Sequence, residues 1–217
     1  MEPPAKSITY WLSRVAARFI SKPDRLQYII TRMKIENVCV FCASSRKAPE
    51  KWLSLARQVG AGLARMGIGV VYGGASIGMM GALADAAMAE GGRVTGVIPK
   101  WLRIKEVAHE GLARLVVTDD MHRRKTAMYD MSDVFVVAPG GLGTLEEALE
   151  IITWKQLGIH TKPVFLLNPE GYFDDLLAQF EKCSEQMLMD RRSFGLWKTA
   201  ASPDELLDHI KFLNFQA

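Results

Sequence analysis

The sequence predicts an α/β protein: a single-domain, Rossmann-like, doubly wound parallel sheet with helices on both faces. From residue 37 onward, short runs of β-branched and apolar residues alternate with longer amphipathic segments. Such alternation is typical of a parallel sheet that is covered by helices on each side. Two of the short runs lead into glycine-rich loops that are followed at once by helical patterns. Ligands of open α/β sheets bind where such loops leave the strands.

Six strands are expected from the apolar runs, and each is followed by a helical pattern. They span residues 38–41, 70–72, 93–98, 115–118, 134–138 and 164–167. The first helix is predicted from one apolar face, formed by Trp52, Leu55, Ala56, Val59, Leu63 and Met66. Further helices are expected over about 82–90, 121–131 and 148–157. Ser202 and Pro203 predict the start of a last helix, since serine is a favoured N-cap and proline a favoured first helical residue.

Residues 1–34 differ from the rest and are expected to form a basic amphipathic extension to a nucleotide-binding α/β domain at 35–217. They hold seven basic and two acidic residues, so their net charge is +5 and that of the remainder is −2. An apolar face at helical spacing is formed by Ile8, Trp11, Leu12, Val15 and Phe19. Such a helix can lie on a membrane surface or pack on the domain or a partner subunit. Packing is the simpler expectation, and a chain that starts near Ile35 should keep the activity of the domain.

The composition indicates a cytoplasmic protein without a bound metal. Cys39 and Cys42 lie three apart on an expected strand, so their side chains point to opposite faces and cannot pair or share a metal. Cys183 has no evident partner, and unpaired cysteines fit a reducing compartment. The four histidines show no ligand spacing, and neither a metal nor a cofactor is expected. The net negative charge of the domain argues against nucleic acid as a partner.

The most informative segment, residues 139–147, reads Pro-Gly-Gly-Leu-Gly-Thr-Leu-Glu-Glu and lies between an expected strand and an expected helix. Its glycines let the backbone approach a ligand closely, and the N–H groups of a helix start attract an anion. Thr144 adds a hydroxyl donor. Glu147 places a carboxylate one turn further along, which phosphate binding alone does not require. The combination indicates catalysis on a phosphorylated ligand.

A second loop, residues 73–81, repeats the strand–glycine–helix arrangement. Neither loop is a standard fingerprint, because the chain contains no G-x-x-x-x-G-K-[ST] and no G-x-G-x-x-G motif. Two unusual phosphate loops in one small domain suggest a ligand of mononucleotide size. The alternative is that the glycines serve only tight β–α turns.

Between the two loops, residues 121–125 read Met-His-Arg-Arg-Lys and open an expected helix at the same sheet edge. Arginine suits phosphate or carboxylate because its planar fork donates two parallel hydrogen bonds and stays charged. A basic cluster at a helix start opposes the helix dipole, so a nearby anion is expected. The alternative is a solvated basic turn.

These three segments together resemble the LOG (Lonely Guy) family of cytokinin riboside 5'-monophosphate phosphoribohydrolases, long catalogued as lysine decarboxylases. The P-G-G-x-G-T-x-x-E loop of the family is matched at 139–147, and its M-x-x-R-K segment by Met121, Arg124 and Lys125. Residues 40–45, 73–81 and 152–154 are also similar, as is Ile98-Pro99-Lys100 with Glu106. The resemblance covers about residues 37–190.

The resemblance implies hydrolysis of the N-glycosidic bond of an adenosine 5'-monophosphate, plain or N6-modified, to the free base and ribose 5-phosphate. It implies Arg124 and Glu147 as the catalytic pair, and a homodimer or higher homo-oligomer as the assembly. The substrate-binding residues that it implies are Ser44, Gly74, Glu106, Lys125, Gly141, Leu142, Gly143, Thr144, Leu145, Glu146 and Thr153. Ala43 and Ala75 depart from the glycines that the family usually has there, and each methyl could narrow the pocket.

The implied chemistry agrees with the residue types. Cleavage of an N-glycosidic bond builds positive charge on the ribose, which a fixed carboxylate stabilises while it orients the attacking water. Arg124 is a poor proton donor, because guanidinium stays protonated, and is expected to anchor phosphate or ribose instead.

Two other functions are compatible with the same sequence. A decarboxylase would need pyridoxal phosphate and a Schiff-base lysine such as Lys125, which lies in a basic cluster better suited to an anion. A nucleotide or molybdenum-cofactor carrier of the same fold would have no need of both Arg124 and Glu147.

Overall fold

The computed structural model of the chain describes residues 34–105 and 108–215. The expected N-terminal extension, apart from Lys34, lies outside these ranges, and so does Glu106. The described residues form one seven-stranded sheet in which every neighbouring pair of strands is parallel. The strand order is β4-β3-β2-β1-β5-β6-β7, so the doubly wound α/β fold that the sequence predicted is confirmed.

The six expected strands are all present, within one residue of the predicted bounds at each end. They are β1 (Asn37–Phe41), β2 (Gly69–Tyr72), β3 (Val94–Pro99), β4 (Arg114–Thr118), β5 (Val134–Val137) and β6 (Val164–Leu167). The seventh strand, β7 (Lys198–Ala200), was not expected. It pairs only with β6, and its three residues are too few to produce a recognisable alternation.

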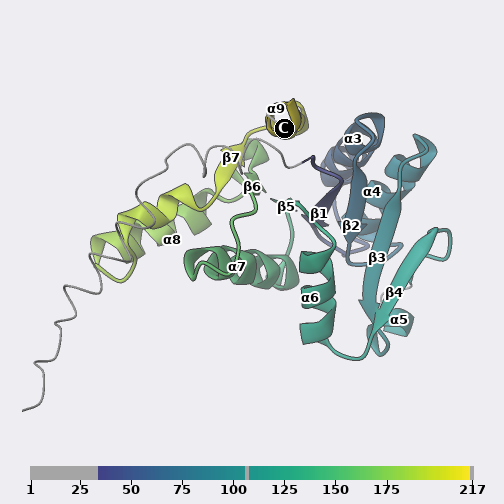
Figure 1. Ribbon diagram of the computed structural model, residues 1–217, viewed down its shortest axis with the longest axis horizontal. Coiled ribbons are helices and arrows are strands. Elements are labelled where there is room, and N and C mark those ends of the chain that lie inside the picture. The colour runs from purple at the N-terminus through teal and green to yellow at the C-terminus, as the bar shows by residue number, and fades with distance from the viewer. Residues whose placement is uncertain (1–33, 106–107, 216–217) are drawn as a thin grey trace, which may run out of the picture.

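Helices cover both faces of the sheet (Figure 1). One face carries α3 (Glu50–Arg65), α4 (Gly78–Ala89) and α9 (Pro203–Phe215), and the other carries α6 (Met121–Asp130), α7 (Leu142–Gln156) and α8 (Asp174–Glu185). The described residues also form three short helical segments: α5 (Leu102–Lys105), η1 (Pro169–Gly171) and η2 (Arg191–Gly195). Buried apolar residues fill the space on each side of the sheet, which gives two core clusters.

Alternate residues of β1, β2, β5 and β6 enter the two clusters. In β1, Val38 and Val40 belong to the cluster under α3 and α4, whereas Cys39 and Phe41 belong to the one under α6 and α7. Cys42 lies in the first cluster, so the two cysteines face opposite sides as expected. Burial, and next the charge of Glu147, raises the pKa of the Cys39 thiol well above its usual value, so this thiol is unreactive.

Two helices begin earlier than the sequence predicted. α7 starts at Leu142 rather than near residue 148, and α4 starts at Gly78 rather than near residue 82. The glycines in these segments suggested longer loops, but Gly143 and Gly81 lie within the first turn of their helices, where glycine is tolerated. The loop after β5 is therefore short, and Thr144 lies inside α7.

The strand order reverses between β1 and β5, because the chain moves outward to β4 on one side and then returns to β5 on the other. In such folds the loops after these two strands leave the sheet in opposite directions at the carboxyl edge, which is where ligands of open α/β sheets bind. Backbone bonds tie them at its base, where the Ala43 N–H donates to Pro139 O and the Ala138 N–H to Phe41 O. Residues 42–44 and 138–141 thus lie together at this edge of the sheet.

His160, in the turn between α7 and β6, predicts a pH dependence of stability. Its ring is buried, Nε2 lies 2.9 Å from the carbonyl of Ile151, and Nδ1 accepts a bond from the Lys162 N–H. Burial lowers the pKa of His160 and outweighs the bond to Ile151. The folded state binds a proton on the His160 ring less readily than the unfolded chain does. The contribution of neutral His160 to stability is therefore complete above about pH 6.5 and is lost as the pH falls.

A His160→Gln variant should therefore lose less free energy of unfolding than the wild type between pH 8 and pH 5. Glutamine can still donate to Ile151 O but does not titrate. Urea denaturation at the two pH values measures the difference. Equal losses in both proteins would show that His160 does not contribute to the pH dependence.

Candidate functional site

The two residues that the sequence predicts as a catalytic pair are brought into direct contact. Nη1 of Arg124, on α6, donates to Oε1 of Glu147, on α7, over 2.8 Å. Both residues are buried, with 6% and 5% of their surface exposed. The guanidinium is also held by a bond from Nε to the carbonyl of Val97 in β3, over 3.0 Å. A buried charge pair of this kind has a fixed geometry, because each member keeps the other from rotating away.

Gly73, at the end of β2, is what allows Arg124 to reach this position. A Cβ added at Gly73 would lie 2.5 Å from Nη2 of Arg124 and within 3 Å of the Met80 side chain. Any other residue would displace the guanidinium or the loop. The next residue, Gly74, has φ +80°, a conformation that favours glycine.

The start of α7 has the properties of an anion site. Gly141 occupies the N-cap in an extended conformation, and no side chain of the described residues caps the helix there. Added Cβ atoms at Gly141 and Gly143 would meet nothing within 4 Å, so the space in front of these residues is open. The first N–H groups of this 15-residue helix are therefore accessible to a ligand.

Packing behind the helix start fixes its position. Thr144 is buried against Gly140, where a side chain would collide with it. The hydroxyl of Tyr172 donates to the carbonyl of Gly140 over 2.8 Å, and its ring packs edge-on against Trp52. Tyr172 was not among the residues predicted from the sequence. An isolated tyrosine after β6 gave no signal, because its contact with Gly140 exists only in the folded chain.

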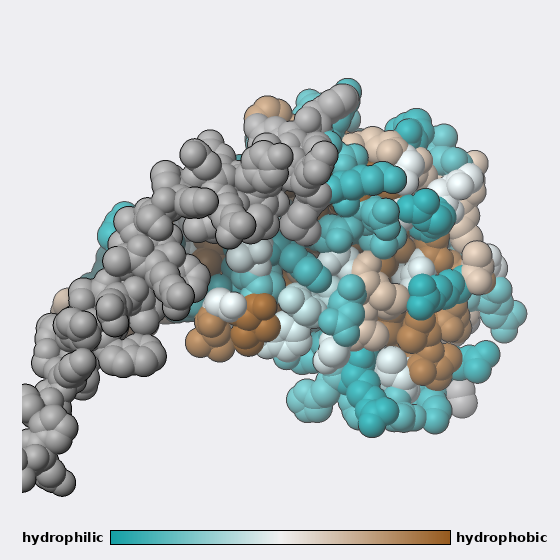
Figure 2. Space-filling view, in the orientation of Figure 1, coloured by the Kyte–Doolittle hydropathy of each residue, from teal (hydrophilic) through white to brown (hydrophobic). Residues whose placement is uncertain are grey.

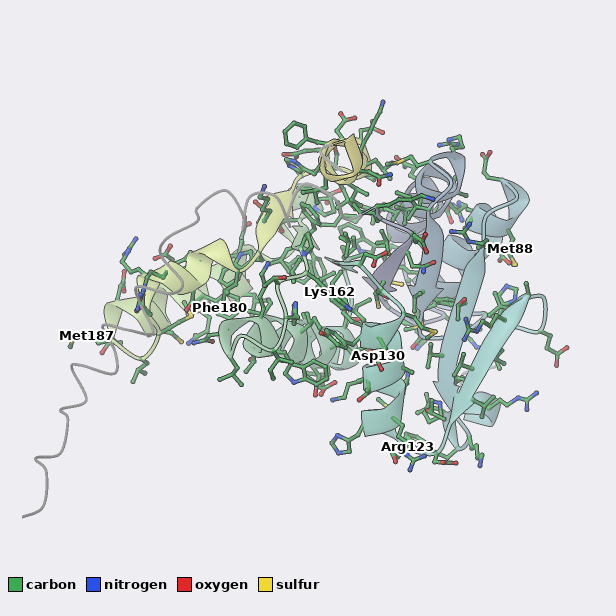
Figure 3. The ribbon with its side chains drawn as sticks, viewed as in Figure 1. Met88, Arg123, Asp130, Lys162, Phe180 and Met187 are labelled. Atoms are coloured by element: carbon green, nitrogen blue, oxygen red, sulfur yellow. The ribbon has the colours of Figure 1, made fainter. Side chains whose placement is uncertain are left out.

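The three consecutive basic residues of α6 point in three directions. Arg123 is exposed at the carboxyl edge of the sheet and pairs with Asp119 and Asp120 (Figure 3). Asp120 also caps α6 by accepting from the Arg123 N–H. These two carboxylates offset the unfavourable interaction of the basic cluster with the helix dipole, so that interaction does not by itself require a bound anion.

Lys125 joins α6 to α7 beside the central pair. Its amine lies 2.6 Å from the carboxylate of Glu146 and 2.9 Å from that of Glu150. Burial alone would lower the pKa of Lys125, but the bonds to the two glutamates outweigh it and raise the pKa. The amine is therefore firmly protonated and engaged, and Glu146 and Lys125 hold each other next to the pair.

The other expected substrate-binding residues lie at different distances from the pair. Ser44 is half-buried in the loop after β1, where residues 44 and 45 leave no room for a side chain at Gly78. Leu142 is exposed at the start of α7 and Leu145 is half-buried one turn on. Thr153 lies on the exposed side of α7, with its hydroxyl bonded to the carbonyl of Leu149, whereas Glu147 faces the core.

The methyl groups that depart from the family pattern do not enter the space around the pair. Ala75 is fully buried in the core cluster under α3 and α4, on the other face of the sheet from Glu147. Ala43 packs at the edge of the same cluster. Neither methyl therefore narrows the approach to Glu147.

A cavity of about 10 Å³, the size of one water molecule, lies beside Glu147, with Tyr129, Phe135 and Trp154 in its walls. This cavity is too small to hold a nucleotide. Within residues 34–105 and 108–215, no group of three or more His, Cys, Asp or Glu side chains is arranged to hold a metal ion. No helix in the same ranges is both long and apolar enough to cross a membrane.

Solved structures with the same fold include molybdenum-cofactor proteins. The molybdenum cofactor binding protein of Rippkaea orientalis has 24% sequence identity and a TM-score of 0.62, over 84% of this chain and 99% of that one. The molybdenum cofactor carrier protein of Chlamydomonas reinhardtii has 21% identity and a TM-score of 0.60, over 82% and 97%. At these identities the likeness establishes the fold alone.

Sequence comparison gives a closer relationship. A family model described as "Possible lysine decarboxylase" matches residues 80–210. The cytokinin riboside 5'-monophosphate phosphoribohydrolase LOG1 of Arabidopsis thaliana is 42% identical over 178 residues, which is 82% of this chain and 84% of that protein. The probable enzyme of the same name, LOGL1, of Oryza sativa subsp. japonica is 46% identical over 176 residues, 81% and 79% of the two chains. The resemblance seen in the glycine loop and the M-x-x-R-K segment is thus confirmed, and the chain belongs to the LOG family.

Proposed function

We propose that this protein hydrolyses the N-glycosidic bond of an adenosine 5'-monophosphate, plain or N6-modified, to release the free base and ribose 5-phosphate. The observation that carries the proposal is the buried contact between Arg124 and Glu147 beside the uncapped start of α7. A carboxylate held next to an anion site suits a reaction in which a phosphorylated sugar becomes cationic. The relatives named as cytokinin riboside 5'-monophosphate phosphoribohydrolases support the same substrate class.

The proposed roles follow from position. The N–H groups of Gly141, Leu142 and Gly143 bind the 5'-phosphate, which fixes the ribose over the carboxyl edge of the sheet. The carboxylate of Glu147 stabilises the positive charge that grows on the ribose as the base leaves, and it orients the attacking water. Arg124 holds Glu147 in place through its bond and contributes positive charge near the phosphate.

The structure makes lysine decarboxylation a poor alternative. Schiff-base formation needs a neutral amine, and Lys125 is held protonated between Glu146 and Glu150. A non-catalytic carrier also explains the geometry less well, because binding alone gives no reason to bury the Arg124–Glu147 pair. Incubation with AMP and with N6-isopentenyl-AMP, followed by chromatography, tests the proposal. Free base is expected from at least one of the two, and intact nucleotide in both reactions would contradict it.

The open space at Gly141 and Gly143 predicts that the 5'-phosphate supplies most of the binding energy. Charge-assisted bonds at a helix start are about twice as strong as neutral ones. AMP should therefore bind at least about tenfold more tightly than adenosine. Calorimetric titration of the Glu147→Gln variant, which should not consume the nucleotide, measures both affinities. Comparable affinities for AMP and adenosine would show that the phosphate is not bound at the start of α7.

We also propose that α7 forms the interface of a homodimer. Large apolar side chains are exposed along it and just beyond its end: Leu142, Leu149, Leu157 and Ile159 are 87%, 42%, 70% and 56% exposed. Figure 2 shows brown apolar surface on the side of the molecule where Figure 1 places α7. Exposed apolar residues that gather on one face are typical of a protein interface.

A Leu157→Arg, Ile159→Arg double variant is expected to sediment as a monomer at a protein concentration where the wild type is a dimer. Leu188→Arg is the matched control, because Leu188 is 82% exposed but belongs to the segment after α8 rather than to α7. An unchanged mass of the double variant, or a loss of assembly in the control, would contradict an interface on α7.

A further inference from the structure

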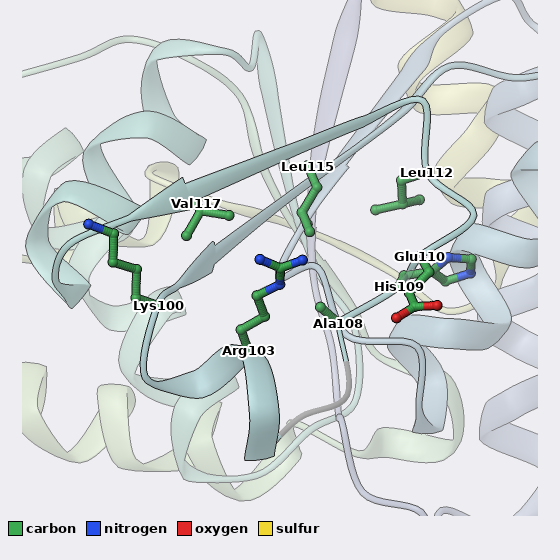
Figure 4. A pocket seen from close by; sticks show the side chains of 8 residues that line it. All are labelled: Lys100, Arg103, Ala108, His109, Glu110, Leu112, Leu115 and Val117. Atoms are coloured by element: carbon green, nitrogen blue, oxygen red, sulfur yellow. The ribbon is translucent and has the colours of Figure 1, made fainter.

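A second pocket lies on the opposite face of the sheet from Arg124 and Glu147. It has a volume of about 850 Å³, which is within the range of small-molecule sites, and Figure 4 shows the side chains that line it. Its floor is the outer half of the sheet, where Leu115 and Val117 project from β4. The walls come from Lys100 and Arg103 on one side and from Ala108, His109 and Glu110 on the other.

Strand register shows that the sheet itself separates this pocket from the catalytic pair. Val97 and its neighbour Val116 point into the cluster under α6 and α7, where Arg124 bonds to the Val97 carbonyl. Because side chains alternate along a strand, Leu115 and Val117 must point to the other face. The sheet therefore lies between this pocket and the pair, and the pocket shares no lining residue with the small cavity beside Glu147.

The far wall of the pocket is anchored to the body of the domain. Ala108 forms an antiparallel bridge with Ala75, and the His109 N–H donates to the carbonyl of Gly74. The buried His109 ring lies between two partners: Nε2 is 2.9 Å from Asp85 on α4, and Nδ1 accepts from the Gly111 N–H. This wall is therefore formed before any ligand arrives.

The lining combines an apolar floor with a cation. The apolar surface is formed by the side chains of Leu112, Leu115 and Val117. The guanidinium of Arg103 points from α5 toward Leu115 (Figure 4). Lys100, at the end nearest the carboxyl edge, is already paired with Asp119 over 2.8 Å. None of the ion pairs between described residues includes Arg103. Glu110 lies at the other end, where it repels an anion and so sets the direction in which one would bind.

We infer that this pocket binds an amphiphilic anion, a small molecule with an apolar chain and a single oxyanion group. The chain would lie on Leu112, Leu115 and Val117, and the carboxylate or phosphate would pair with the planar fork of Arg103. The residues that would hold the ligand, Arg103, Leu112, Leu115 and Val117, are not among those expected to bind the nucleotide, so the inference does not depend on the proposed hydrolysis.

Three ten-carbon probes test this inference by calorimetric titration of the full chain: decanoate, decyl phosphate and decan-1-ol. Both anions are expected to bind, and the uncharged alcohol about tenfold or more weakly, since it cannot form the charged bonds to Arg103. The anion that binds more tightly, decanoate or decyl phosphate, shows whether the site prefers a carboxylate or a phosphate. Saturation with AMP should leave these affinities unchanged, because the sheet separates the sites.

Arg103→Met keeps the apolar stem but removes the charge, and should reduce binding of the anions to the level of the alcohol. Val117→Glu, at a position that is 39% exposed, should abolish binding of all three without unfolding the domain. Arg57→Met, at an exposed arginine of α3, is the matched control. Absence of binding, wild-type affinity in Arg103→Met, or competition with AMP would each overturn the inference.

Discussion

Glu147→Gln is expected to reduce turnover of the nucleotide about 100-fold or more, with little change in its affinity. Glutamine has the size and shape of glutamate, and its carbonyl can still accept the bond from Arg124. It lacks the negative charge that would stabilise the cationic ribose in the transition state. Because that charge matters only as the bond breaks, the loss should appear in kcat rather than in KM.

Steady-state kinetics with AMP or N6-isopentenyl-AMP, whichever is hydrolysed faster, measures this effect. Glu150→Gln is the matched control. Glu150 is on the same helix and, like Glu147, accepts a bond from a basic residue of α6, but its partner is Lys125. The Glu150→Gln variant should keep most of the wild-type turnover. Near-normal turnover of Glu147→Gln would remove Glu147 from the chemical step and favour a carrier function.

Arg124→Ala is expected to lower the free energy of unfolding by about 3–5 kcal/mol, in addition to slowing turnover. Removal of the guanidinium takes one charged hydrogen bond away from the buried carboxylate of Glu147, and the Val97 carbonyl loses its bond to Nε. The variant should also bind AMP more weakly, because Arg124 contributes positive charge near the phosphate. Urea denaturation and calorimetry measure the two effects separately.

Arg123→Ala is the control, one residue away on the same helix. Arg123 is exposed, and its ion pairs within residues 34–105 and 108–215 are with exposed carboxylates, so its loss should cost no more than about 1 kcal/mol. Equal destabilisation by the two substitutions would show that the effect comes from α6 in general. An Arg124→Ala protein as stable as the wild type would show that the buried pair does not stabilise the fold.

The fold was predictable because its strands are short apolar runs between helices with one apolar face. β7 was not predictable, since a three-residue edge strand carries no periodic signal. The starts of α4 and α7 were predicted too late, because glycine in a first helical turn has the same appearance in a sequence as glycine in a loop.

The candidate site was predictable only in part. The glycine loop and the Met-x-x-Arg-Lys segment identified Arg124 and Glu147, but no sequence pattern shows that their side chains touch. The three basic residues of α6 appeared as one cluster, whereas helical geometry sends each to a different neighbour. The contact of Tyr172 with Gly140 joins residues 32 apart and depends on the packing of two separate loops.

The bond between Arg124 and Glu147 also joins the two halves of the doubly wound sheet. Arg124 follows β4, the outermost strand of one half, and Glu147 follows β5, the first strand of the other. Neither half contains both charges, so a partly folded chain with only one half in place has no complete reaction centre. Enzymatic activity should therefore be among the last properties to return on refolding, and free base should not be released before the two halves have docked.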